Sequence, residues 1–272
     1  MVDVNFSENP EKQTSASLIK KIDISETILK ACQVPGVKIN RASFLRGAFR
    51  NHFDEETIER AIESTPAKAG IHVDELDPIA KGAINYEALK TISLSAAAGI
   101  PGGLAMIGTV PGDVLQYFAH VLRIVQKLAY LYGWPDFFEL NEDRIEFNED
   151  KIDDATKNEI ILFLGVMFST VGAENGLAKV AEMLAKNAAK KLPQQALTKG
   201  VVYPIVKKVA GMLGKQMTKQ IFARSVSKAI PLIGAAVSGG MTAATYTPMS
   251  YKLKNYLAEL KIATQVDESW PR

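Results

Sequence analysis

Two uncharged stretches of small residues constrain what this chain can fold into. Thr91–Gly112 and Ala229–Tyr251 contain no Asp, Glu, Lys or Arg and consist largely of small side chains. Each has about the length of a membrane-spanning helix, roughly 20 residues. However, large apolar side chains are few, and Gly and Pro interrupt both stretches. The sequence leaves two alternatives open: buried helices of a bundle, or partial or full insertion into a membrane.

Small residues recur at a spacing of four within both stretches. The pairs are Gly99 and Gly103, Gly108 and Gly112, Gly234 and Ser238, Ala235 and Gly239, Ala236 and Gly240, and Gly240 and Ala244. Residues four apart lie on the same face of a helix, and small side chains on that face let two helix backbones approach closely. This pattern predicts tightly packed helices in either environment.

The rest of the chain carries a helical pattern from about residue 15 to residue 260. Apolar residues recur three or four positions apart, and few segments alternate as a half-buried strand does. Asn40, Asp54 and Asp77-Pro78 are typical of helix N-termini. Pro111-Gly112-Asp113 begins another helix, expected to end at Tyr132-Gly133. We predict an all-α protein, a multi-helix bundle in which the uncharged stretches are two Gly- and Ala-rich helical segments.

Composition and helix breakers divide the chain of 272 residues into four parts. We expect a flexible tail over residues 1–14, an N-terminal helical unit over 15–70, a main helical domain over 71–262 and a C-terminal tail over 263–272. Cys32 is the only cysteine, so no disulfide can form within the chain, and the polar N-terminus lacks the apolar core of a secretion signal. These features favour a reducing, cytoplasmic location.

A net charge of only +2 hides two oppositely charged segments. Residues 136–159 hold ten acidic and three basic side chains, a net charge of −7. Residues 179–228 hold eleven basic side chains and one acidic side chain, a net charge of +10. Such a separation indicates an anionic partner surface for the basic segment, or contact between the two segments themselves.

The basic segment alternates lysines with apolar residues, which is typical of helices that lie on an anionic membrane surface. We expect lipid or partner binding by five lysines: Lys190, Lys191, Lys207, Lys208 and Lys215. A solvated basic face is the other interpretation of the same pattern. Nucleic acid is disfavoured, because Tyr203 and Phe222 are the only aromatic residues in 179–228 and leave few platforms for base stacking.

A polar stripe runs along the helix expected to follow Pro111. Its members recur every three or four residues: Asp113, Gln116, His120, Arg123 and Lys127. If this helix lies at the surface, the stripe is the polar face of an amphipathic helix. If the helix is buried, the ionisable groups need partners and could form a polar site. The first four residues of the stripe are our candidate polar site.

No catalytic constellation is evident, and we predict no metal site and no cofactor. Ser238 lies in an Ala-x-Ser-x-Gly segment, but all three histidines precede it, which is not the order of a hydrolase triad. One cysteine and three histidines without a His-Glu-x-x-His motif give little support for zinc. We therefore do not expect an enzyme, and a site built on Asp113, His120 and Arg123 is the alternative.

Residues in the main domain resemble a known bacterial family. Gly108-Thr-Val-Pro111-Gly-Asp113 leads into a helix ending Tyr132-Gly133-Trp134, and a later segment reads Pro231-Leu-Ile-Gly234 before a run of small residues. Over roughly residues 80–260 this arrangement resembles the EcsC family. It is similar, more distantly, to the helical membrane-associated domain appended to some Era-like GTPases. The resemblance implies an α-helical, membrane-associated bacterial protein without an established reaction.

These observations lead to one expected function and one alternative. We expect a membrane-associated helical protein at the inner face of the cell membrane, which binds an anionic lipid surface or a membrane protein through its basic helices. The alternative is a soluble helical adaptor whose basic surface docks an acidic protein partner or its own 136–159 segment.

Overall fold

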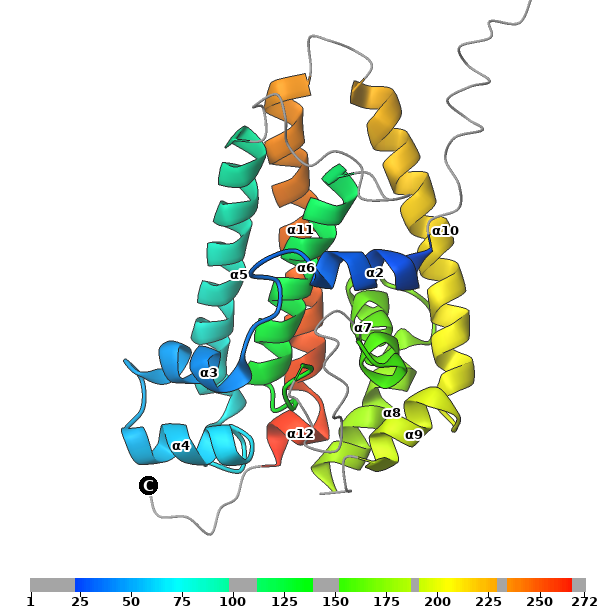
Figure 1. Ribbon diagram of the computed structural model, residues 1–272. Helices are drawn as coiled ribbons and strands as arrows, with labels where there is room; N and C mark the ends of the chain where they lie inside the picture. Colours follow the sequence, from blue (N-terminus) through cyan, green and yellow to red (C-terminus); the bar gives the residue numbers. More distant parts are fainter. Residues whose placement is uncertain (1–22, 98–111, 139–151, 187–190, 229–233, 266–272) are drawn as a thin grey trace, which may run out of the picture.

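The computed structural model describes residues 23–97, 112–138, 152–186, 191–228 and 234–265. It describes the backbone alone for residues 91–97, 112–113, 191, 220–228 and 234–245. Within these ranges all regular secondary structure is α-helical, which confirms the predicted all-α class. Figure 1 shows a bundle in which long helices rise together, with shorter helices packed across and below them.

Three short helices open the described chain: α2 (Ile24–Cys32), α3 (Arg41–Phe49) and α4 (Glu55–Glu63). The Asn40 side chain accepts a hydrogen bond from the Ser43 N–H at 2.9 Å, and Asp54 accepts one from the Thr57 N–H at 2.8 Å. These oxygens replace the acceptors that the first turn of a helix lacks. The two predicted helix starts at Asn40 and Asp54 are therefore confirmed.

Helix α5 (Val73–Ala97) begins four residues before the predicted start at Asp77-Pro78. The His72 N–H donates to Glu75 Oε2 at 2.9 Å, so a carboxylate in the first turn reaches back to cap the residue ahead of the helix. Pro78 lies inside the helix, where it removes one backbone hydrogen bond to the exposed Asp74. The predicted start was wrong because this cap places the N-terminus upstream of the proline.

Helix α6 (Gly112–Leu131) runs through the middle of the fold and is buried along almost its whole described length. It is followed, as predicted, by Gly133, which has a φ of +94°. The Trp134 N–H donates to Ala129 O at 2.9 Å and the Gly133 N–H to Tyr130 O at 3.3 Å. This is the pattern of a Schellman cap, which places a left-handed residue, usually glycine, just after the helix.

Six further helices complete the described chain: α7 (Asp154–Met167), α8 (Ala173–Ala185), α9 (Lys191–Thr198), α10 (Tyr203–Lys228), α11 (Gly234–Ala258) and α12 (Lys261–Thr264). α10, α8 and α9 all pack against α7, and α11 returns alongside α5 while also contacting α6 and α7. α7 is therefore the central helix of the C-terminal half, as α6 is of the other half. Figure 1 shows α5 and α10 on opposite sides of the bundle.

The two uncharged stretches meet at one end of the bundle. α5 takes in residues 91–97 of the first and α11 takes in residues 234–251 of the second, so both contribute helical segments as predicted. α5 and α11 make the most extensive helix–helix contact in the described chain and lie side by side in Figure 1. Residues 98–111 and 229–233 lie outside the described residues. No helix in the described ranges is both long and apolar enough to cross a bilayer.

The N-terminal helices share one core with the rest of the described chain. α2 packs against α6 and α7, and Ile28 and Leu45 are fully buried in the same apolar cluster as the α6 side chains. Gln126 of α6 holds the loop between α2 and α3 through the backbone of the loop. Gln126 Nε2 donates to Val37 O at 2.8 Å, and Gln126 Oε1 accepts from the Ile39 N–H at 2.8 Å. The described residues on both sides of Gly70 therefore pack as one unit.

Candidate functional site

A carboxylate in the interior gathers much of the polar stripe of α6. Glu87 of α5 has no exposed surface, and His120, Arg123 and Lys127 of α6 face it across the α5–α6 contact. His120 is 5% exposed and Lys127 is 8% exposed. The stripe is therefore an interior feature with an acidic partner, and this part of α6 is not a surface helix.

The partners of Glu87 bind it at different distances. Lys127 Nζ lies 2.7 Å from Glu87 Oε1, and Arg123 Nη2 lies 3.1 Å from the same oxygen. Arg123 Nη1 also donates to Gly36 O in the loop between α2 and α3. His120 Nδ1 is 3.9 Å from Glu87 Oε2, which is beyond hydrogen-bond distance. The cluster thus ties α5, α6 and the α2–α3 loop together.

Electrostatics keep Glu87 charged in this interior site. Burial disfavours the charged form, but the facing His120, Arg123 and Lys127 side chains outweigh burial and hold the pKa of Glu87 well below its usual range. Two permanent cations therefore face one anion.

Aromatic rings stabilise one of those two cations. Lys127 Nζ lies 4.9 Å from the centre of the Tyr86 ring and 5.7 Å from the centre of the Phe44 ring. The negative face of an aromatic ring attracts an ammonium group that has lost its water. Glu87 compensates the charges of Arg123 and Lys127, and the two rings further stabilise Lys127. This is the arrangement of a structural ion network.

The other candidates of the polar stripe lie apart from this network. Gln116 is half-buried in α6 one turn before His120, and Asp113 lies in the first turn of α6, where only the backbone is described. Of the four candidate residues, the structure therefore brings His120 and Arg123 together.

Reasoning from sequence missed Glu87, although α5 carried a signal. Leu76, Ala80 and Ile84 form a buried stripe at a spacing of four, and Glu87 follows three residues later on the same side. A carboxylate at an apolar position of a helix needs a buried cation, and the stripe of α6 supplies two.

Helix α10 exposes a row of lysines on the side that points away from the bundle. The basic face of α10 consists of Lys207, Lys208, Lys215 and Lys219, all exposed. The apolar side of the helix lies in the core: Val206, Val209, Leu213 and Met217. The helix thus offers charge to a partner, while its apolar side already packs against the bundle. Of the other predicted lysines, Lys190 lies outside the described residues and Lys191 is described by its backbone alone.

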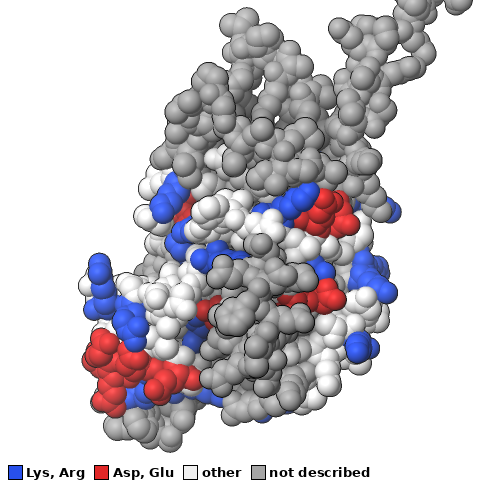
Figure 2. Space-filling model, viewed as in Figure 1, with Lys and Arg blue, Asp and Glu red and all other residues white. Residues whose placement is uncertain are grey.

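The lysines of this face are not paired with any carboxylate that the structure describes. Over the part of the chain that the structure describes, none of the four forms an ion pair, and no acidic residue occurs in the sequence between Glu182 and Glu259. Lys81, by contrast, is exposed and pairs with Asp77 at 2.6 Å. Figure 2 shows basic side chains along the right-hand edge, where α10 runs in Figure 1, the largest acidic group over α4, and smaller acidic groups on the right half.

Three described carboxylates of the acidic segment 136–159 engage the bundle. Asp136 Oδ2 accepts from the Arg41 N–H at 2.8 Å, and Glu159 Oε1 accepts from Trp134 Nε1 at 2.8 Å. Asp153 is the N-cap of α7. None of these three carboxylates contacts the basic face of α10, and residues 139–151 lie outside the described residues.

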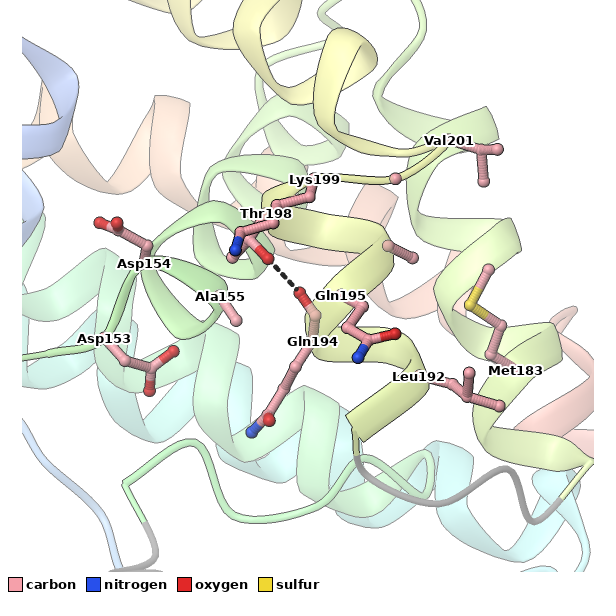
Figure 3. A pocket seen from close by; sticks show the side chains of 12 residues that line it. Asp153, Asp154, Ala155, Met183, Leu192, Gln194, Gln195, Thr198, Lys199 and Val201 are labelled. Carbon is pink, nitrogen blue, oxygen red and sulfur yellow. Dashed lines mark hydrogen bonds between the residues drawn. The ribbon is translucent and has the colours of Figure 1, made fainter.

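A shallow groove of about 890 Å³ lies between the start of α7 and α9. Figure 3 shows Asp153 and Asp154 on one wall, with Gln194 and Gln195 of α9 opposite and Lys199 just after that helix. Among residues with described side chains, no group of three or more His, Cys, Asp or Glu could hold a metal ion. The groove is lined by polar, charged and apolar side chains of the surface.

Comparison of the chain with protein-family models, with characterised proteins and with solved structures gives no match. The resemblance to the EcsC family stays a prediction from the residues quoted above. The arguments for a function rest on the geometry of the basic face of α10 and of the Glu87 network.

Proposed function

We propose that this protein binds anionic membrane surfaces peripherally, through the basic face of α10. The observation that carries the proposal is a row of four exposed lysines on one helix, none of which forms an ion pair among the described residues. From Lys207 to Lys219 the row spans about 18 Å at the rise of an α-helix. Ammonium groups held along one line repel each other, and a layer of lipid phosphates relieves that repulsion.

The packing of α10 favours adsorption over insertion. An interfacial helix buries its apolar side among acyl chains, but here Val206, Val209 and Leu213 are already in the protein core. Binding through the lysines alone is electrostatic, so it weakens as salt screens the charges.

The Glu87 network supports binding over catalysis. Its carboxylate has no exposed surface, and its two closest cations contact the carboxylate itself. A general acid or base has to reach a substrate within hydrogen-bond distance. The network is better suited to fixing α5 and α6 in a rigid scaffold for the basic face.

The test is binding to phospholipid vesicles at low salt. Wild-type protein is sedimented with vesicles containing phosphatidylglycerol and with vesicles of phosphatidylcholine alone, and binding to the anionic vesicles alone is expected. Each lysine near such a surface contributes about 1 kcal/mol. The triple variant K207Q/K208Q/K215Q is therefore expected to bind roughly a hundredfold more weakly.

A matched control distinguishes an effect of the basic face of α10 from an effect of net charge. The variant K81Q/K186Q/K261Q removes three exposed lysines elsewhere, each paired with a carboxylate, and lowers the net charge equally. It is expected to bind nearly as wild type does. Equal losses in the two triple variants, or wild-type protein that binds no anionic vesicle, would overturn the proposal. In the second case the acidic protein partner expected from the sequence is the next candidate.

A further inference from the structure

Beside the basic face of α10, a tight turn holds one apolar side chain out in solvent. Val171, between α7 and α8, is 71% exposed, the largest value for a bulky apolar residue in the described chain. The residues around it are anchored in the protein: Thr170 is 8% exposed and Ala173 is fully buried. Val171 therefore protrudes alone from a well-packed turn.

The turn is held in a conformation that few sequences adopt. Ser169 has a φ of +56° and Gly172 a φ of +89°, and Ser169 is the only residue other than glycine with positive φ among those described. The Thr170 N–H donates to Gly165 O at 2.7 Å and so ends α7. A left-handed residue with a side chain is strained, and such strain persists only where the surrounding structure enforces it.

Contacts on both sides of Val171 place it next to α10. Gln216 Nε2 donates to Phe168 O at 3.0 Å, and a methyl group built on Gly172 would lie 3.9 Å from Ile205 Cγ2. The turn thus lies along the stretch of α10 between Ile205 and Gln216. Lys208 and Lys215 of the basic face belong to that stretch.

A further cation stands at the same turn. Lys252 Nζ of α11 donates to Ser169 Oγ at 3.0 Å and lies 3.4 Å from Glu174 Oε1. The surface around Val171 therefore combines an exposed apolar tip with the lysines of α10 and with the Lys252–Glu174 pair.

We infer that Val171 is the apolar anchor of the membrane-binding surface, inserting between anionic lipid headgroups while the lysines of α10 hold the phosphates. The inference rests on the proposed function and assigns one residue to the bilayer. A flat anionic surface that meets Lys208 and Lys215 also meets the turn beside them. The rigid turn means that Val171 is presented without loss of backbone freedom on binding. Transfer of an exposed valine side chain from water to the membrane interface is favourable.

The experiment compares single variants for binding to phosphatidylglycerol vesicles. V171S is expected to lower the partition coefficient about three- to tenfold, because it removes apolar surface at no change in charge. V171W is expected to raise it, since tryptophan favours the membrane interface, and the added indole emission is expected to shift to shorter wavelength with vesicles. L89S is the control, because Leu89 is 63% exposed on α5, across the bundle from α10.

The outcomes separate this inference from the proposed function. If V171S and V171W both bind as wild type does while K207Q/K208Q/K215Q loses binding, the lysines act alone and the anchor is refuted. If L89S weakens binding as much as V171S, the effect is not specific to the turn and the anchor is again refuted. All variants are first checked for an unchanged thermal midpoint, which is expected because both side chains are exposed.

Discussion

Replacing Glu87 by glutamine is expected to destabilise the fold by about 3 to 5 kcal/mol. The substitution keeps the shape of the side chain and removes its charge. Arg123 and Lys127, whose nitrogens lie 3.1 Å and 2.7 Å from Glu87 Oε1, would then stay in the interior without a counter-ion. The loss is a large part of the 5 to 15 kcal/mol that typically separates folded from unfolded states.

Urea unfolding of E87Q measures this free energy, with Glu56→Gln as the control. Glu56 also pairs with an arginine, Arg60, at 3.0 Å, but its side chain is 75% exposed. An exposed pair of this kind contributes about 0.5 kcal/mol or less. An E87Q variant within about 1 kcal/mol of wild type would refute the reasoning, since the buried Lys127 and the partly buried Arg123 would then need no anion.

A second variant tests whether an unpaired buried charge causes the loss of stability in E87Q. Lys127→Met removes one cation and leaves an apolar chain against the Tyr86 and Phe44 rings. The double variant E87Q/K127M is expected to lose less stability than the sum of the single losses, because K127M removes the buried cation that E87Q alone leaves without its counter-ion. Additive losses would contradict the proposed network.

The pH dependence of the Glu87 contribution has a definite sign. The pKa of Glu87 is lowered in the folded protein, so the folded state binds the proton more weakly than the unfolded chain does. The stability difference between wild type and E87Q is therefore expected to be complete above pH 4.5, the value of a free glutamate, and to shrink only as the pH falls below it.

Two further changes test other parts of the core. Burial raises the pKa of Glu159 to about 7, against the opposing hydrogen bond from Trp134. A raised folded pKa means that the Glu159 contribution is most favourable below about pH 4.5 and is lost as the pH rises towards 7. E159Q is therefore expected to gain about 1 to 3 kcal/mol at pH 8, allowing for partial exposure, and to lack this slope in urea unfolding between pH 5 and 8. Gly165→Ala would bring a Cβ to 2.6 Å from both Ala173 Cβ and Val209 Cγ1, so a loss of about 1 to 3 kcal/mol in the same assay is expected, and an unchanged midpoint would contradict the packing described.

Features set by neighbours in the sequence were predictable. Asn40 and Asp54 cap their helices with side chains that reach three residues along the chain, so the signal and its effect lie together. Gly133 ends α6 because a left-handed residue must follow that helix. The start of α5 was missed because the cap at His72 depends on the Glu75 side chain. That residue is a weaker sequence signal for a helix start than the Asp-Pro pair downstream.

Features set by distant residues were not predictable. Glu87 meets Arg123 across 36 positions, and no local pattern specifies that pairing. The lysines of α10 were recognised as a basic segment. Their sequence alone did not show that the valines between them pack against the bundle, because periodicity says which residues share a face and not what covers it.

The hydrogen bonds that fix the loop between α2 and α3 also set the order in which the chain can fold during synthesis. Gln126 binds Ile39 across 87 positions, and Asp136 binds Arg41 across 95. A ribosome adds about 5 to 20 residues per second, so on the order of 5 to 20 s pass between the emergence of the two partners. During that interval the apolar side of α2, with Ile28, lacks the residues of α6 and α7 that cover it, whereas α3 already has α4 beside it. α2 is thus completed in its packing long after it is made, and the nascent chain is expected to depend most on chaperones before α6 emerges.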